Sequence, residues 1–338
     1  MGMLFSLFVV IALVVAAYVI ELAGGMAGSV LLGVIIPYAA VAVFLGGFVY
    51  KIFDWARSPV PFRIPTTSGQ QKSLPWIKRN KLDNPSGTLG VIGRMFLEIF
   101  LFRSLFKNTK ADLREEGPRL VYGSSKWLWM AGLAFHWSLL FIVVRHFRLF
   151  VEPVPAFVNA LAGADGFLQL TLPDFYITDA VILLAVTYLF LRRVAIPQLK
   201  TFSLAADYFP LFLILGIAGS GVLMRYVTKV NIVGVKSLVN GLFTFHPNIP
   251  EGIGSIFYIH LLLVSALLVY FPFSKLMHMG GVWMSPTRNL SNNSRVKRHI
   301  NPWNPDVKFH TYEEYEDDFR KFMKMVGLPV EKDEEEEE

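Results

Sequence analysis

Four histidines lie in two strongly apolar segments of the chain. AGLAFHWSLLFIVVRHFRLF (131–150) contains two of them, and YIHLLLVSALLVYFPFSKLMH (258–278) contains the other two. They are His136, His146, His260 and His278. Polar groups inside a membrane-crossing segment are costly and commonly mark a functional site. Both segments are therefore candidates for cofactor or ion chemistry.

The order of these histidines predicts two pairs. If the two segments cross a membrane in opposite directions, His136 and His278 lie near the inner face, and His146 and His260 near the outer face. A bis-histidine haem needs one imidazole on each side of the iron, from helices that face each other. Eighteen residues make five full helical turns, but ten residues fall about 80° short of a whole number. Helix tilt and a kink at Pro272 would absorb this difference.

Other interpretations compete with haem ligation. A single intramembrane histidine is commonly a hydrogen-bonded core residue. Zinc or copper prefers ligands clustered at one level, whereas these histidines divide between two. A transporter for protons or metal ions would need a polar path along several helices, and the other apolar stretches have few polar groups. A cofactor-free anchor subunit would leave the four histidines unexplained.

Cationic side chains accompany the histidines. Arg145 and Arg148 flank His146, and a guanidinium group pairs well with a carboxylate such as a haem propionate. The alternative is that both arginines reach out to the membrane interface. Lys275 is the corresponding candidate for an inner haem.

The composition indicates an integral membrane protein. Of the 338 residues, 54% are hydrophobic and 29 are Phe, which is unusual for a soluble domain. Six stretches are long and apolar enough to cross a bilayer at about 20 residues each, and the first is too long for a cleaved signal peptide. The expected fold is an all-α, six-helix transmembrane bundle with two b haems stacked across the membrane. The six stretches are 3–22, 27–50, 127–150, 176–194, 208–228 and 253–277.

Charge and cysteine usage restrict the chemistry and the topology. Segment 51–126 has 14 Lys and Arg residues and 151–174 has none, so the positive-inside rule predicts that 51–126 and both termini are cytoplasmic. The basic loops lack the interleaved aromatic residues of a nucleic-acid site, and no nucleic-acid partner is expected. Cysteine is absent, which excludes disulfides, covalent c-type haem and an iron–sulfur cluster on this chain's own thiolates.

The chain divides into four predicted parts. Within the second part, 91–108 is predicted to form an amphipathic helix at the cytoplasmic interface. The tail contains a predicted helix, TYEEYEDDFRKFMKMVGL, and is expected to dock a soluble partner; the alternative is a solvated, partly disordered end. The parts are a transmembrane hairpin (1–50) around the turn AGGMAG, a cytoplasmic loop (51–126), a four-helix core (127–278) and a cytoplasmic tail (279–338).

The segments FHWSLLFIVVRHF and FPFSKLMH resemble the haem-ligand segments of the respiratory nitrate reductase gamma subunit family, which are diheme cytochromes b. In that family the ligands fall on two helices with the same ten- and eighteen-residue spacings, and an FPF-S-K/R-L-x-H sequence closes the last helix. The likeness covers about 127–280. Six spans, a cytoplasmic N-terminus and the long loop differ from the family's five spans and external N-terminus. This layout is more similar to the membrane cytochrome b subunits of Dsr-type complexes and Hdr-like menaquinol oxidoreductases.

The resemblance implies a quinol-oxidising electron-transfer subunit with two b haems. Menaquinol would deliver electrons to the haems, and a cytoplasmic iron–sulfur subunit similar to heterodisulfide reductase would receive them. Further membrane and periplasmic redox subunits would complete the complex. Carried over by position, His146 pairs with His260 at the outer haem and His136 with His278 at the inner one. Near the outer haem, the candidates for an outer quinol site are Glu152, Asp174, Tyr176, Tyr226 and Lys229, each of which is also a common interface residue.

Overall fold

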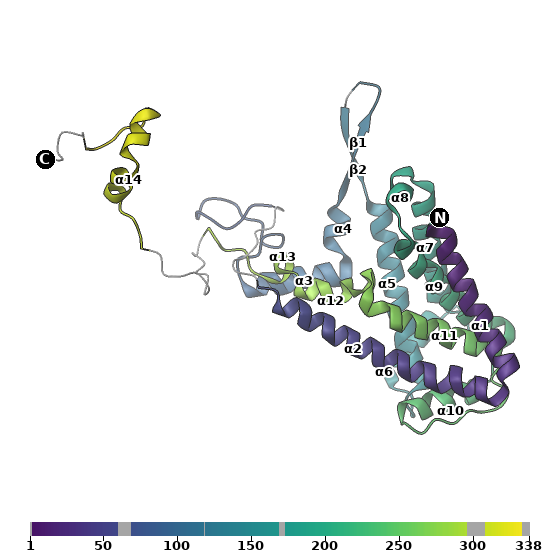
Figure 1. Cartoon of the computed structure of the whole chain (residues 1–338). Helices are drawn as coiled ribbons and strands as arrows, with labels where there is room; N and C mark the ends of the chain where they lie inside the picture. The colour runs from purple at the N-terminus through teal and green to yellow at the C-terminus, as the bar shows by residue number, and fades with distance from the viewer. Residues whose placement is uncertain (1, 60–68, 118, 169–172, 296–307, 333–338) are drawn as a thin grey trace.

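A bundle of long helices forms the body of the protein, with a β-hairpin and a C-terminal helix projecting from it (Figure 1). The computed structural model describes residues 2–59, 69–117, 119–168, 173–295 and 308–332. The long helices are α1 (Gly2–Val30), α2 (Ile36–Arg57), α5 (Lys126–His146), α7 (Ile177–Ala195), α9 (Ala205–Val222) and α11 (Ser255–Tyr270). Helices α1, α5, α9 and α11 continue into the short helical turns η1 (Leu31–Ile35), η2 (Phe147–Leu149), η3 (Leu223–Thr228) and η4 (Phe271–Phe273), respectively. The shorter helices of the bundle are α6 (Ala156–Asp165), α8 (Pro197–Phe202) and α10 (Ile232–Phe243).

The first two predicted spans form one long helical stretch that bends at Gly25. That residue has φ 52° and ψ −131°, a conformation that glycine adopts without steric cost. The backbone segments on the two sides of the bend pack closely. A Cβ on Gly28 would lie 2.2 Å from the carbonyl oxygen of Ile20, so glycine is needed there. Instead of the turn expected at AGGMAG, the chain keeps helical hydrogen bonding on both sides of one glycine (Figure 1).

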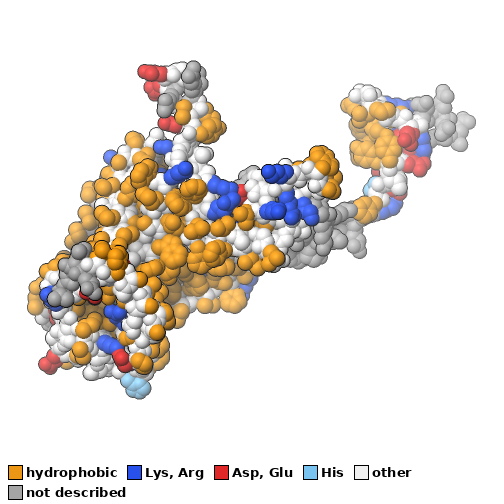
Figure 2. Space-filling view, turned by 180° about the vertical axis from the view of Figure 1, so that it is seen from behind, with side chains coloured by type: hydrophobic (Ala, Val, Ile, Leu, Met, Phe, Trp, Pro, Cys, Tyr) orange, Lys and Arg blue, Asp and Glu red, His pale blue; other side chains and the backbone are white. Residues whose placement is uncertain are grey.

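Four stretches of the described chain are long and apolar enough to cross a membrane. The 19-residue helix α7, at the predicted span 176–194, is not among them because it has charges at both ends, Asp179, Arg192 and Arg193. Hydrophobic side chains cover much of the outer surface of the helical body (Figure 2), as lipid contact requires. All six predicted segments are largely helical, and a count of six crossings stays a prediction. The four stretches are Gly2–Arg57, Lys126–Leu149, Ala205–Thr228 and Ser255–Phe273.

Polar contacts identify which helix ends lie together. At one end of the bundle, the Ser6 hydroxyl is 3.0 Å from the carbonyl oxygen of Ala205 at the start of α9. At the other end, the Ser255 hydroxyl donates to Glu21 at 2.5 Å. The start of α1 therefore lies beside the start of α9, and the end of α1 beside the start of α11, as an alternating path through the bundle requires.

The helix expected over 91–108 is interrupted at Phe102. Helix α3 (Thr88–Leu101) ends where Phe102 takes a left-handed conformation with φ 49° and ψ 46°, and α4 (Arg103–Lys107) follows. The prediction of one continuous helix is wrong because left-handed backbone cannot continue a right-handed helix. An antiparallel hairpin, β1 (Thr109–Arg114) and β2 (Arg119–Ser124), comes next and was not expected from the sequence.

Helix α3 turns its charged side toward the protein and its apolar side outward. Arg94 is 3% exposed, and Glu98 accepts a hydrogen bond from Arg288 at 2.9 Å. The exposed side chains at helical spacing are all apolar, which suits a helix that lies in a membrane interface. They are Leu89, Ile92, Phe96 and Phe100.

The last predicted span ends before the fourth histidine. Helix α11 stops at Tyr270, and the turns η4 and η5 (Lys275–Met277) separate it from α12 (His278–Met284). Pro272 lacks a backbone donor, and Ser274 is extended, with φ −124° and ψ 176°. His260 and His278 therefore do not share one continuous helix face, so the argument from five helical turns does not apply.

The C-terminal tail contains the predicted helix. Helix α14 (Tyr312–Met325) begins with a capping box between Thr311 and Glu314, and Figure 1 shows it apart from the bundle. Glu316 fixes the residues after the helix, because its carboxylate accepts the backbone N–H groups of Glu331 and Lys332 at 2.8 and 2.9 Å. Earlier in the tail, α12 is followed by the short α13 (Pro286–Asn289).

Candidate cofactor sites

The two histidines of the predicted inner pair lie close together in space. The ring centroids of His136, in α5, and His278, at the start of α12, are 5.9 Å apart, with the ring planes at 83°. A metal ion bonds imidazole nitrogen at about 2.0–2.1 Å, which would place the centres of two opposing rings roughly 6 Å apart. The observed separation therefore fits one ion held between these rings.

Hydrogen bonds fix the tautomer of three of the four imidazoles. Nδ1 of His136 lies 2.7 Å from the carbonyl oxygen of Gly132, and Nδ1 of His146 lies 2.7 Å from that of Ile142. Nδ1 of His278 has the same contact with Lys275, at 2.8 Å. A carbonyl oxygen only accepts, so Nδ1 carries the proton and Nε2 keeps its lone pair. This is the arrangement that orients a metal-binding histidine.

The fourth imidazole reaches the same state through a side chain. Nδ1 of His260 lies 2.9 Å from the hydroxyl oxygen of Ser220, in α9. That hydroxyl also contacts the carbonyl oxygens of Gly216 and Ile217 at 2.7 and 3.0 Å, and its single proton must point to them. Ser220 therefore accepts from Nδ1 of His260, whose Nε2 is left as the free ligand atom.

The partners of the outer pair also lie near each other, since His146 and His260 interact electrostatically. None of the four histidine side chains is buried: His146 and His278 are exposed, and His136 and His260 are partly exposed. Their free Nε2 atoms therefore remain accessible to a bound group. In the described part of the chain, no three His, Asp or Glu residues form a group that could hold a metal ion. Two separate pairs fit axial ligation of haem better than a zinc or copper cluster.

Arg145 pairs with carboxylates of this chain, which differs from the predicted contact with a propionate. Its guanidinium lies 3.2 Å from Asp165 and 2.7 Å from Asp179, and its Cζ is 3.8 Å from the ring centroid of Tyr176. The side chain of Arg145 is 8% exposed. The charge of Arg145 is thus already balanced, and the residue ties α5 to α6 and α7.

Arg148 keeps unused donor capacity beside the outer histidine. Its Nη1 contacts the hydroxyl of Tyr176 at 3.3 Å, while its buried Nε has no hydrogen-bond partner among the described residues. Arg148 meets the hydroxyl of Tyr176, whereas Arg145 lies over its ring. Arg148 is therefore the better placed of the two predicted arginines for an added carboxylate.

The remaining predicted residues divide into two groups. Tyr176 and Tyr226 belong to the Arg145 network, since the Tyr226 hydroxyl accepts from the Tyr176 backbone at 2.9 Å and donates to Asp179 at 3.0 Å. Asp174 joins the network through its carbonyl oxygen, which accepts from Arg225 at 2.9 Å. Away from it, Glu152 pairs with Lys236, and Lys275 pairs with Asp207 at 2.7 Å. Lys229 ends η3 in a left-handed conformation.

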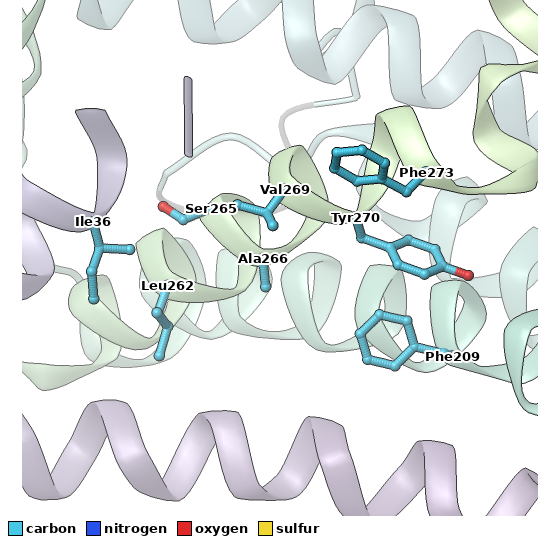
Figure 3. A pocket seen from close by; sticks show the side chains of 8 residues that line it. All are labelled: Ile36, Phe209, Leu262, Ser265, Ala266, Val269, Tyr270 and Phe273. Atoms are coloured by element: carbon cyan, nitrogen blue, oxygen red, sulfur yellow. The ribbon is translucent and has the colours of Figure 1, made fainter. Parts of the chain in front are cut away.

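An apolar hollow of about 450 Å³ lies between α2, α9 and α11, away from the histidines. Figure 3 shows Phe209, Tyr270 and Phe273 at one end of it and Ile36 at the other. Its lining includes no histidine and no charged residue, so it is separate from the two histidine pairs.

Two residues that the sequence did not single out contact the histidines. Ser220 stands in the small-residue run GIAGSG, which could have indicated close helix approach; a Cβ on Gly221 would lie 3.5 Å from the His260 ring. Phe102 packs its ring edge-on against His136, with centroids 4.9 Å apart. No sequence signal marks Phe102, because its position depends on the break after α3.

Comparisons with known proteins show the family of the chain. The family model of the nitrate reductase gamma subunit matches residues 98–299. The chain is 47% identical, over 82% of its length and 84% of the relative's, to the Hdr-like menaquinol oxidoreductase cytochrome b-like subunit of Archaeoglobus fulgidus. The subunit of the same description from Archaeoglobus profundus is 41% identical over 80% of this chain and 82% of the relative. The chain therefore belongs to the nitrate reductase gamma subunit family of membrane cytochromes b.

Proposed function

We propose that this chain is the diheme cytochrome b subunit of a menaquinol oxidoreductase complex. His136 and His278 are the axial ligands of an inner b haem, and His146 and His260 those of an outer one. The chain crosses the membrane six times and both termini are cytoplasmic. The observation that carries the proposal is the pairing of His136 with His278, whose ring centroids lie 5.9 Å apart, and the engagement of Nδ1 by an oxygen atom in all four imidazoles agrees with it.

The donor set supports haem over other groups. Bound haem would supply the one-electron chemistry between a two-electron quinol and a one-electron acceptor. The chain's own part is to hold each site. The carbonyl oxygens of Gly132, Ile142 and Lys275 and the hydroxyl of Ser220 orient the imidazoles, and each of these bonds also raises the basicity of the ligand nitrogen.

Arg148 is the residue that we assign to an outer haem propionate. Its buried Nε lacks a partner in the described chain, and a buried guanidinium is stabilised by a carboxylate. Arg145 has the supporting role of holding α5, α6 and α7 together at the same end, through Asp165 and Asp179.

Quinol oxidation is assigned to the outer side, near Tyr176 and Tyr226. Quinol loses two protons with its electrons, so its site needs hydrogen-bonding groups close to the outer haem. The backbone N–H of Tyr176, the Tyr226 hydroxyl and the Asp179 carboxylate already form a connected hydrogen-bond chain there. If haem reduction by a menaquinol analogue is unchanged in Tyr226→Phe but lost after inner-side substitutions, the outer assignment is wrong.

The partner that takes the electrons is a cytoplasmic iron–sulfur subunit of the heterodisulfide reductase type. Support comes from the two archaeal relatives, which are described as subunits of an Hdr-like menaquinol oxidoreductase. The tail helix α14 offers a surface for such a partner, since Tyr315, Phe319 and Phe322 are exposed along one side. Further membrane and periplasmic subunits complete the proposed complex.

The test is a count of haem per chain. The protein is purified in detergent, and dithionite-reduced minus oxidised spectra and a pyridine haemochrome assay give the amount of b haem. We expect two haems per polypeptide in the wild type, and one in both His278→Ala and His260→Ala. A redox titration should show that each variant lacks a different one of the two haems, because the haem that remains titrates at a different midpoint potential in each. His246→Ala is the matched control, because this exposed histidine lies in a loop and its Nδ1 contacts the carbonyl oxygen of Thr244. A wild-type protein without haem would overturn the proposal and favour the transporter.

A further inference from the structure

Phe102 stands in a conformation that its side chain disfavours. Its φ of 49° and ψ of 46° are left-handed, and only Phe102, Lys229 and Phe245 among the described non-glycine residues have positive φ. Glycine and asparagine adopt this conformation at the end of a helix far more readily than phenylalanine. Strained backbone is retained where the surrounding structure and a function require it. The contacts of the Phe102 ring are therefore the place to look for a reason.

The ring of Phe102 contacts an inner histidine. Its centroid lies 4.9 Å from that of His136, with the planes at 88°. Phe135 contacts the same imidazole at 4.9 Å and 80°. Together the two phenyl rings restrict rotation of the His136 ring, which stands at 83° to the plane of His278.

The position of Phe102 is fixed from the side of α5. The indole N–H of Trp129 donates to the carbonyl oxygen of Leu101 at 2.7 Å, and that of Trp137 donates to Phe100 at 3.0 Å. The end of α3 has unpaired carbonyl oxygens that need such donors. Two tryptophans on the helix that bears His136 therefore hold the strained residue against that histidine.

We propose that Phe102 is a positioning residue that holds the imidazole of His136 perpendicular to that of His278, and so sets the ligand geometry and the redox potential of the inner haem. This inference rests on the proposed diheme function. It also gives the α3–α4 segment, outside the predicted core 127–278, a direct contact with an inner ligand. Phe102 acts only through His136 and is not itself a ligand.

The test separates the ring from the backbone. Phe102→Asn removes the ring and favours left-handed backbone, so a residue that only ended the helix would tolerate the change. Phe102→Tyr keeps the ring. Phe100→Ala is the matched control, since Phe100 is on the same segment but its ring packs on Trp137 instead, with centroids 6.2 Å apart. The readouts are the low-spin haem signals in electron paramagnetic resonance, which report the angle between axial imidazole planes, and a redox titration of both haems.

We expect Phe102→Asn to bind both haems but to shift the inner low-spin signal. At a fixed poise, its ratio of reduced to oxidised inner haem should change by about threefold or more, which is roughly 30 mV for one electron. Phe102→Tyr and Phe100→Ala should match the wild type, and the outer haem should be unchanged throughout. If Phe102→Asn does not accumulate, Phe102→Leu decides the question by the same readouts. An unshifted inner signal in a variant that has lost the ring overturns the inference, whereas absence of haem from the wild type overturns the proposed function instead.

Discussion

The hydroxyl oxygen of Ser220 lies 2.9 Å from Nδ1 of His260 and joins α9 to the ligand helix α11. The three other histidines have a backbone carbonyl in this place, whereas His260 has the Ser220 hydroxyl together with the backbone of Ile217. The Ser220 hydroxyl is therefore a contact to a predicted ligand that substitution can remove.

Ser220→Ala should weaken the outer haem site selectively. Loss of the hydroxyl leaves the His260 ring held by the backbone of Ile217 alone, and removal of such outer-shell partners typically costs about 10–100-fold in affinity or activity. The measurement is haem retention of the purified protein during dilution, with a redox titration to identify which haem is lost. Ser265→Ala is the control, because Ser265 is also buried but lies in the lining of the apolar hollow. Equal losses from both haems would contradict the assignment.

Arg145→Ala should destabilise the fold at the outer end of the bundle. The substitution leaves Asp165, whose side chain is 1% exposed, without its cation, and breaking a buried pair in this way costs about 3–5 kcal/mol. The measurement is the midpoint of unfolding in a denaturing detergent. Asp165→Asn in the Arg145→Ala background should recover part of the loss. Lys51→Ala breaks the exposed pair with Asp54 and should cost less than about 1 kcal/mol.

Gly47→Ala should disturb the turn that leads to His278. A Cβ at Gly47 would lie 2.7 and 2.9 Å from Cβ and Cγ of Pro272, so α2 must move away from η4. Overpacking of this kind costs about 1–3 kcal/mol. Gly46→Ala is the neighbouring control, since a Cβ there has no atom within 4 Å, and it should be neutral or more stable by up to about 1 kcal/mol. The measurement is the temperature at which each variant loses the absorbance of the inner haem. Equal temperatures for Gly47→Ala and Gly46→Ala would contradict the prediction.

The fold of the tail should depend on pH through Glu316. The backbone N–H groups of Glu331 and Lys332 hold the pKa of the Glu316 carboxyl below its ordinary value, with a further contribution from Arg320. A lowered pKa in the folded state means that the stabilisation is present above the ordinary glutamate pKa. It is lost as the pH falls through the lowered pKa.

Hydrogen–deuterium exchange of the full chain measures this effect. At neutral pH, residues 328–332 should exchange faster in Glu316→Gln than in the wild type, and the two rates should converge at acid pH. Comparison at equal pH cancels the intrinsic pH dependence of exchange. Asp318→Asn is the control, because its carboxylate is exposed and, within the described part of the chain, pairs with His310 at 4.0 Å. A difference that persists unchanged in acid would show that another group holds the segment.

Several features followed from residue types alone. The apolar stretches, the four histidines within two of them and the capped helix after Thr311 could be identified because membrane burial and helix capping leave local patterns. The resemblance to the nitrate reductase gamma subunit rested on two short segments and is confirmed by the family match. Each of these features depends on residues close together in the chain.

Other features were decided only by the tertiary structure. The sequence around Phe102 predicts a continuous helix. In the structure, α3 ends before it, where the indoles of Trp129 and Trp137 bind the last carbonyl groups, and its ring packs on His136. Arg145 looked like a partner for a propionate, but folding brings Asp165 and Asp179 to it from two other helices. These contacts join residues 20 to 40 positions apart, and the free energy that selects them comes from packing and charge pairing between elements. No local sequence pattern contains that information.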